Sequence, residues 1–133
     1  NTTFSGPVRS ENGFEQITKN TSTGAITTDA VYNATIRGGV QTLTGAGAVD
    51  LTNLVTELTT TGADALTLAD GTTSGQVKIV NMIVDGGDGT LTPTTFANGT
   101  TITFDAVAES ATLVWNSTIG WVATSVQGAT IAQ

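Results

Sequence analysis

The sequence contains no cysteine and no histidine among its 133 residues. Without cysteine, the chain has no disulfide framework, no zinc–thiolate site and no thiol chemistry. Without histidine, Ser–His and Cys–His catalysis are excluded in their standard forms. Small secreted domains often depend on disulfides, so their absence favours a protein that folds in the cytoplasm. We expect no cofactor, no signal peptide and no transmembrane span.

Charge is also scarce, and basic charge most of all. Only 11% of the residues are charged, whereas a typical soluble domain has about 25%. Eleven acidic residues against four basic ones give a formal net charge of −7. Binding of nucleic acid needs clustered lysine and arginine, and an anionic membrane surface attracts the same residues. We therefore expect neither nucleic acid nor a membrane among the partners.

Threonine and glycine take the place of the missing charged residues, with 29 threonines and 16 glycines. The branched Cβ of threonine suits a pleated strand, and glycine marks turns. This composition predicts an all-β protein with a neutral, hydroxyl-rich surface, and the length is enough for one domain with its own core. Uncharged β edges invite association with other chains. Assembly into a homo-oligomer would cover these edges.

The pattern of the chain divides it into an extended N-terminal arm, residues 1–24, and a β-domain, residues 25–133. Short apolar stretches separated by turn signals are typical of a jelly roll or a β-sandwich. The absence of a repeat of about 20–50 residues argues against a solenoid. We expect strands at Ala30–Ile36, Gln41–Thr44, Leu51–Thr60, Ala65–Leu68, Gly75–Val84, Thr90–Leu91, Thr101–Phe104, Thr112–Trp115 and Trp121–Val126.

One of these stretches, Leu51–Leu58, fits two patterns. Its apolar residues recur at the i, i+3, i+4 and i+7 positions of a helix. Three β-branched residues and the following Thr59–Thr61 run favour a strand instead. We interpret it as a strand.

Three separators favour tight turns, because their residues tolerate positive φ: Asp70-Gly71, Gly86–Gly89 and Asn98-Gly99. Asn98-Gly99 precedes the alternating stretch Thr101–Phe104, so a hairpin is predicted there. The segment Asp85–Gly89 invites comparison with a calcium loop, but it supplies only two carboxylates where an EF-hand needs alternating oxygen ligands and a closing glutamate. We interpret it as a two-glycine turn without a metal.

Alternation along the strands predicts the core, because residues two apart share a face. The predicted core pairs are Ile102 with Phe104, Val77 with Ile79, Leu66 with Leu68, and Leu113 with Trp115, which Trp121 joins across a hairpin. Lys78 interrupts an apolar strand, and we interpret it as facing solvent or a neighbouring subunit.

The acidic residues offer no clear catalytic pair. A glycosidase would need two carboxyl groups about 5–10 Å apart. Most candidates lie beside glycine or at strand ends, where they cap turns, namely Asp70, Asp85, Asp88 and Asp105. We expect a protein that is not an enzyme.

Two parts of the sequence carry a resemblance to known proteins. The segments Thr3–Ser10 (TFSGPVRS) and Asn12–Phe14 (NGF) resemble the start of small structural proteins of tailed bacteriophages, especially those of marine and cyanobacterial hosts. A second set of segments is similar to β-domains of phage head-decoration proteins and of some fibre and spike proteins. This set comprises Gly75–Ile79, Asp85–Pro93, Gly99–Phe104, Leu113–Trp115 and Gly120-Trp121. The resemblance implies an all-β, trimeric module on the virion exterior.

The leading interpretation is a capsid decoration (cement) protein on the outer surface of the phage head. It would bind the major capsid protein as a homotrimer, bridge neighbouring capsomers and stabilise the assembled shell. The arm supplies the expected contacts. Pro7 lowers the cost of ordering an extended segment, Phe4 and Phe14 would fill pockets, and Arg9 would pair with a capsid carboxylate. Alternatively, the two phenylalanines fold back onto their own domain.

The alternative function is a fibre, knob or spike module that binds a host-surface receptor or glycan. Exposed tryptophan or tyrosine would favour sugar stacking, but Trp115, Trp121 and Tyr32 lie in expected strands, where we expect them to be buried. A virion-bound glycan hydrolase is a third and least favoured interpretation, because no acid pair stands out.

Overall fold

The computed structural model describes residues 16–19, 22–29 and 38–133 of the chain. These residues belong to two compact units, Asn1–Arg37 and Gly38–Gln133. In the first unit, β1 (Gln16–Lys19) and β2 (Ile26–Asp29) pair antiparallel. This pair extends across residues 24 and 25, where the sequence suggests a boundary between arm and domain. The strand expected at Ala30–Ile36 lies outside the described residues.

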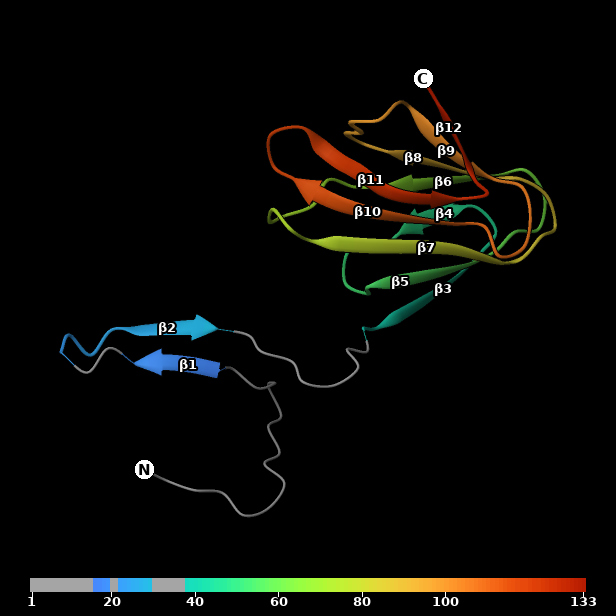
Figure 1. Ribbon diagram of the computed structural model, residues 1–133. Coiled ribbons are helices and arrows are strands. Elements are labelled where there is room, and N and C mark those ends of the chain that lie inside the picture. Colours follow the sequence, from blue (N-terminus) through green and yellow to red (C-terminus); the bar gives the residue numbers. More distant parts are fainter. Residues whose placement is uncertain (1–15, 20–21, 30–37) are drawn as a thin grey trace, which may run out of the picture. The chain divides into compact units, whose positions relative to one another are not determined.

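The second unit consists of two five-stranded sheets whose inner faces share one hydrophobic core (Figure 1). The first sheet has the order β11-β10-β7-β5-β3, and the second has the order β12-β9-β8-β6-β4. We call them the β7 sheet and the β8 sheet. The strands of the β7 sheet are β3 (Val40–Thr44), β5 (Val55–Thr59), β7 (Val77–Val84), β10 (Ser110–Asn116) and β11 (Gly120–Gln127). Those of the β8 sheet are β4 (Gly47–Val49), β6 (Asp64–Leu68), β8 (Gly89–Pro93), β9 (Thr101–Phe104) and β12 (Thr130–Ala132).

The first six strands of this unit alternate between the two sheets. As a result β3, β5 and β7 run parallel in one sheet, while β4, β6 and β8 run parallel in the other. Two parallel strands need a crossover connection, and here each crossover contains a strand of the opposite sheet. The last four strands, β9 to β12, pair antiparallel and complete both sheets.

This topology confirms the all-β prediction and identifies the β-sandwich of the two expected architectures. A jelly roll is antiparallel throughout, whereas both sheets here are mixed. The expectation against a solenoid agrees with this sandwich, in which strands β3 to β8 form a coil of parallel strands that alternates between the two sheets. Val40 pairs with Val55, and Val55 pairs with Ile79, so successive turns of the coil differ in length. Unequal turns leave no fixed period in the sequence.

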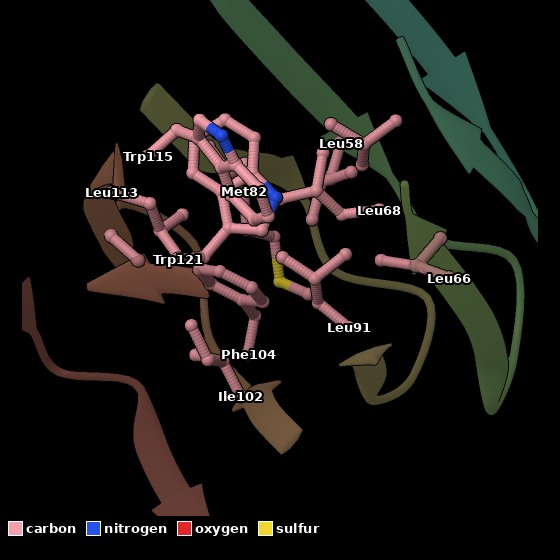
Figure 2. Packing of buried hydrophobic residues seen from close by; sticks show 13 residues of the cluster. Leu58, Leu66, Leu68, Met82, Leu91, Ile102, Phe104, Leu113, Trp115 and Trp121 are labelled. Carbon is pink, nitrogen blue, oxygen red and sulfur yellow. The ribbon is translucent and has the colours of Figure 1, made fainter. Parts of the chain in front are cut away.

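The core lies between the sheets and centres on two tryptophans. Trp115 and Trp121 oppose each other on β10 and β11, with ring centroids 5.4 Å apart in an edge-to-face arrangement. The indole Nε1 of Trp121 donates a hydrogen bond to the main-chain oxygen of Ala69 at 2.9 Å. Figure 2 shows the leucines, Met82 and Phe104 gathered around this pair. The predicted core residues that are confirmed as buried are Leu66, Leu68, Ile102, Phe104, Leu113, Trp115 and Trp121.

The prediction for β7 is wrong by one residue. Lys78 is only 1% exposed and points inward with Val80 and Met82, whereas Val77 is 38% exposed on the outer face and Ile79 lies beside it. The strand reads VKIVNMIV, so apolar residues occupy both faces and the alternation alone does not decide between them. A shift of one residue exchanges the two faces completely.

Two connections also differ from expectation. The predicted hairpin is confirmed, because β8 and β9 pair antiparallel, but its connection is longer than a two-residue turn at Asn98-Gly99: β8 ends at Pro93 and β9 begins at Thr101. Asn98 instead ties the connection to β11 and to the end of the chain: its Oδ1 accepts from the Ala123 N–H and its main-chain oxygen accepts from Gln133 Nε2. In the stretch Leu51–Thr60, the strand is confirmed only from Val55 onward, and the residues before it form bends rather than a helix.

The predicted two-glycine turn at Asp85–Gly89 is confirmed between β7 and β8. Gly87 has a φ of 142° and its N–H donates to Asp85 Oδ1. The Gly86 N–H donates to Thr60 Oγ1, and a side chain at Gly86 would collide with the Thr60 main chain. The turn is therefore held against the β5–β6 connection, where only glycine fits.

Replacing Leu91 by alanine tests this core. Leu91 is fully buried in the middle of the β8 sheet, and deleting a buried leucine side chain costs about 2–5 kcal/mol of unfolding free energy. The matched control is Thr92→Ala, one residue further along the same strand on the exposed face, for which the change should stay within about 0.5 kcal/mol. Urea denaturation monitored by tryptophan fluorescence measures both. Equal losses at the two positions would contradict the assignment of faces.

Candidate functional site

The four predicted arm contacts, Phe4, Pro7, Arg9 and Phe14, lie outside the described residues, and so does Tyr32. Their roles stay predictions. The described residues contribute candidate sites of two other kinds: the outer faces of the two sheets, and a partly buried polar cluster around Lys78.

The outer face of the β7 sheet carries a continuous group of β-branched apolar residues. One row of neighbours on β3, β5 and β7 consists of Val40, Val55 and Ile79. A second row on β7, β10 and β11 consists of Val77, Val114 and Val122. Val77 and Ile79 are two residues apart on β7, so the two rows adjoin. We call these six residues the valine face. Val40 is 47% exposed and Val77 is 38% exposed.

Charge is almost absent from this outer surface. Among the outward-facing positions of the five described strands, Glu57 is the only ionisable residue, and the others beside the valine face are threonine, serine, asparagine, glutamine and isoleucine. A face with a single ionisable residue is unusual on a chain with a net charge of −7. It lets like-charged copies approach without direct repulsion, since surface charges act over about 10 Å at moderate salt.

The outer face of the β8 sheet is lined by hydroxyl groups instead. Thr67 pairs with Thr92 across β6 and β8, and Thr90 pairs with Thr103, which pairs with Thr130. The neutral, hydroxyl-rich surface predicted from composition is thus confirmed on this sheet.

A polar cluster lies between the sheets at the connection from β4 to β5, and Lys78 is its only cation. The Lys78 ammonium donates a hydrogen bond to the main-chain oxygen of Asn53 at 2.7 Å and lies 3.6 Å from Asp50 Oδ1. Asp50 accepts from the N–H groups of Thr52 at 2.9 Å and Asn53 at 2.7 Å, and its Oδ2 accepts from Asn53 Nδ2 at 2.7 Å. The carboxylate therefore bridges the amine of Lys78 and the side-chain amide of Asn53.

Gln41 extends this cluster to β3 and β5. Its Oε1 accepts from the buried Thr56 hydroxyl at 2.8 Å and from the Asp50 N–H at 2.9 Å, while its Nε2 donates to the Ala48 main-chain oxygen. Buried polar groups are costly unless they are paired. The pairing here fixes how the β4–β5 connection crosses the end of the sandwich.

Burial and hydrogen bonding move the pKa values of both charged members. Burial lowers the pKa of Lys78 below its ordinary value, and the Asp50 carboxylate only partly opposes this. For Asp50, burial acts to raise the pKa, but the hydrogen bonds from Asn53 and Thr52 and the positive charge of Lys78 together hold it below 3.8. The amine is thus easier to deprotonate, and the carboxylate harder to protonate, than on an exposed strand.

The acidic residues proposed as turn caps behave in different ways. Asp85 caps its own turn, as expected, and Asp70 Oδ2 accepts from the Thr95 hydroxyl at 3.1 Å. The described part of the chain contains neither a cluster of three acidic residues that could hold a metal nor a ligand-sized cavity. Sequence reasoning missed the Asp50–Lys78 cluster, and the one available signal was a lysine between apolar residues on a strand.

Within residues 16–19, 22–29 and 38–133 there is no helix long and apolar enough to cross a membrane. Comparison of the chain with protein-family models and with curated proteins gives no match.

The substitution Asp50→Asn tests the buried cluster through its pH dependence. The amide would place an N–H₂ group against the donor Asn53 Nδ2, and the loss of these hydrogen bonds should cost about 1–3 kcal/mol of unfolding free energy at pH 7. Because the pKa of Asp50 is lowered in the folded state, its contribution is present above 3.8 and is lost as the pH falls through the folded value. The difference in unfolding free energy between wild type and variant should therefore become smaller below pH 3.8.

Chemical denaturation at pH 7 and at acid pH measures this effect. Asp105→Asn serves as the control, because Asp105 is an exposed residue in the β9–β10 connection and surface changes usually stay within about 0.5 kcal/mol. A variant at Asp50 that is as stable as wild type at neutral pH, or a difference that does not narrow in acid, would contradict the role assigned to the carboxylate.

Proposed function

We propose that the chain is a decoration (cement) protein of a tailed-bacteriophage head. In this proposal homotrimers bind the major capsid protein on the outer surface of the assembled head and bridge neighbouring capsomers. The protein turns over no substrate and contacts neither nucleic acid nor a membrane. The segments Thr3–Ser10, Gly75–Ile79 and Asp85–Pro93 support the proposal through their resemblance to phage virion proteins.

The structural observation that carries the proposal is the valine face. The face is exposed at Val40 and Val77 and half-buried at its other four residues. An outward-facing apolar group across all five strands of a sheet is what a protein interface needs at its centre, where charged residues are depleted. We assign this face to contacts between copies of the chain, because its lack of charge allows molecules of net charge −7 to meet there. In closed symmetric assemblies the same patch recurs on every subunit.

The arm then supplies the contacts with the capsid. Phe4 and Phe14 fill apolar pockets on the shell, Arg9 pairs with a carboxylate, and Pro7 restricts the backbone between them. Trimerisation would present three arms at once, so binding of the first arm raises the effective concentration of the other two. Each arm can then bind the capsid weakly while the trimer as a whole binds it tightly.

The receptor-binding alternative finds less support among the described residues. A glycan site commonly presents an aromatic ring for stacking, but Trp121 is fully buried, Trp115 nearly so, and Phe104 lies in the core. We therefore retain the decoration protein as the proposed function.

Co-sedimentation with undecorated capsids of the parent phage tests this proposal. The intact protein should bind saturably, and a form lacking residues 1–24 should not sediment with the shells. Phe4→Ala and Phe14→Ala should each weaken binding, whereas Ser5→Ala in the same segment should leave it unchanged. Bound protein should also raise the temperature at which the shells open, as expected for a ligand of the assembled state.

The outcome that contradicts the proposal is specific. If neither form bound shells while the intact protein bound host cells, the decoration role would be wrong and the fibre or spike module would replace it.

A further inference from the structure

Lys78 is a buried amine placed among groups that are able to react with it. It is 1% exposed, and its Nζ atom donates a hydrogen bond to the main-chain oxygen of Asn53 and lies 3.6 Å from Asp50 Oδ1. Both residues belong to the β4–β5 connection. An ion pair with a purely structural role would need only the Asp50 carboxylate. Here the Asn53 carboxamide also lies beside that carboxylate, bonded to its second oxygen, and Asp50 and Asn53 belong to the same short segment.

Asp50 lies next to both nitrogen atoms between which a proton would have to move. Its Oδ1 is 3.6 Å from Lys78 Nζ, and its Oδ2 accepts a hydrogen bond of 2.7 Å from Asn53 Nδ2. General acid–base catalysis requires a group within hydrogen-bond reach of the proton donor and of the leaving group. Oδ2 is within hydrogen-bond reach of Asn53 Nδ2, while Oδ1 lies 3.6 Å from Nζ, and catalytic hydrogen bonds that are long in the resting state tighten when the groups react.

We propose that Lys78 and Asn53 form an intramolecular amide bond, with Asp50 as the proton carrier. The Lys78 Nζ atom attacks Asn53 Cγ as the free amine. The new Nζ–Cγ bond forms, the Cγ–Nδ2 bond breaks, and the amide nitrogen leaves as ammonia. Asp50 Oδ1 accepts the proton that Nζ loses, and the carboxyl group delivers a proton to Nδ2 through Oδ2. The step needs no oxidant, no nucleotide and no second protein.

Three features of the site favour this reaction over an inert ion pair. The four-carbon stem of Lys78 is fixed by the strands around it, so the reaction is intramolecular, and effective molarities in such cases reach about 10⁵ M or more. Burial lowers the pKa of Lys78, which increases the fraction of nucleophilic amine at neutral pH. Gly39 leaves room for the carboxamide, since a side chain there would collide with Asn53 Oδ1.

Asn53 is a better acyl donor than Asp50 in this arrangement. The Asp50 carboxylate accepts hydrogen bonds from two main-chain N–H groups and from Asn53 Nδ2. These bonds stabilise the anion, and a carboxylate anion is a poor electrophile. The bond to Asn53 would tie β7 covalently to the connection that leads from β4 to β5, and so close the coil of parallel strands with a covalent bond.

The intact mass of the full-length protein, measured after denaturation, tests the proposal directly. The expected mass is lower than the sequence mass by one ammonia. A mass equal to that of the sequence would overturn the proposal. A mass lower by one water would also overturn it, because the acyl donor would then be Asp50.

Digestion after glutamate locates the bond. Cleavage at Glu15, Glu57 and Glu109 separates Asn53 and Lys78 onto two peptides, 16–57 and 58–109. In the bonded protein these two peptides should remain joined and fragment as a branched species at Asn53 and Lys78. Recovery of two separate, unmodified peptides contradicts the proposal.

Three substitutions distinguish the roles of the residues. Lys78→Arg keeps a positive charge but removes the nucleophile, so the mass should equal the sequence mass of the variant. Asn53→Asp should react with loss of water in place of ammonia. Asp50→Asn should retain Lys78 and Asn53 yet show a much slower mass change, or none. A bond that forms at an unchanged rate in Asp50→Asn would show that Asp50 does not carry the proton.

This inference is independent of the decoration role. It depends on residues inside one chain, and its test uses the purified protein without capsids, so either claim can fail without the other.

Discussion

The alternation of consecutive strands between two sheets is the constraint on which the rest of the structure depends. Each of the five strands from β3 to β7 is followed by one in the opposite sheet, so every strand must present one face to the same central core. Parallel pairing follows, because strands of one sheet are separated by a strand of the other. The antiparallel strands β9 to β12 then extend both sheets, and β11 brings Trp121 against Trp115.

The same constraint explains the polar cluster at one end of the sandwich. The connection between β4 and β5 must pass from one sheet to the other while its main chain remains paired. Asp50 satisfies two N–H groups of this connection, and Lys78 satisfies the main-chain oxygen of Asn53. An ion pair contributes little net stability by itself, but removing the Asp50 carboxylate leaves the buried Lys78 ammonium without its counter-charge. The cluster therefore specifies one path for the connection.

Sequence reasoning succeeds where strands have one apolar face and fails where they have two. The stretches DALTL and TITF alternate cleanly, and their buried residues, Leu66 and Leu68 or Ile102 and Phe104, follow directly from the pattern. In β7, apolar residues fill both faces, so the pattern does not show that Lys78 rather than Val77 points inward.

Pairing between distant strands cannot be read from local patterns either. The parallel register of β5 with β3 and β7 depends on crossovers of different lengths, which leave no repeat in the sequence. The Asp50–Lys78 cluster depends on that register, because its members come from separate turns of the coil. The arm residues lie outside the described structure, so their contacts rest on sequence alone.

The inward faces complete the core and leave two outer faces, one of valine and isoleucine with Glu57 as its ionisable residue among the described strands, and one of threonine. The central claim is that the valine face holds copies of the chain together as a trimer. Sedimentation equilibrium of wild type, Val77→Lys and Thr67→Lys tests it most directly, since both substitutions add one positive charge at an exposed strand position on opposite sheets. The account predicts trimers for wild type and Thr67→Lys and monomers for Val77→Lys. A monomeric wild type, or a trimer that survives lysine at position 77, would contradict it.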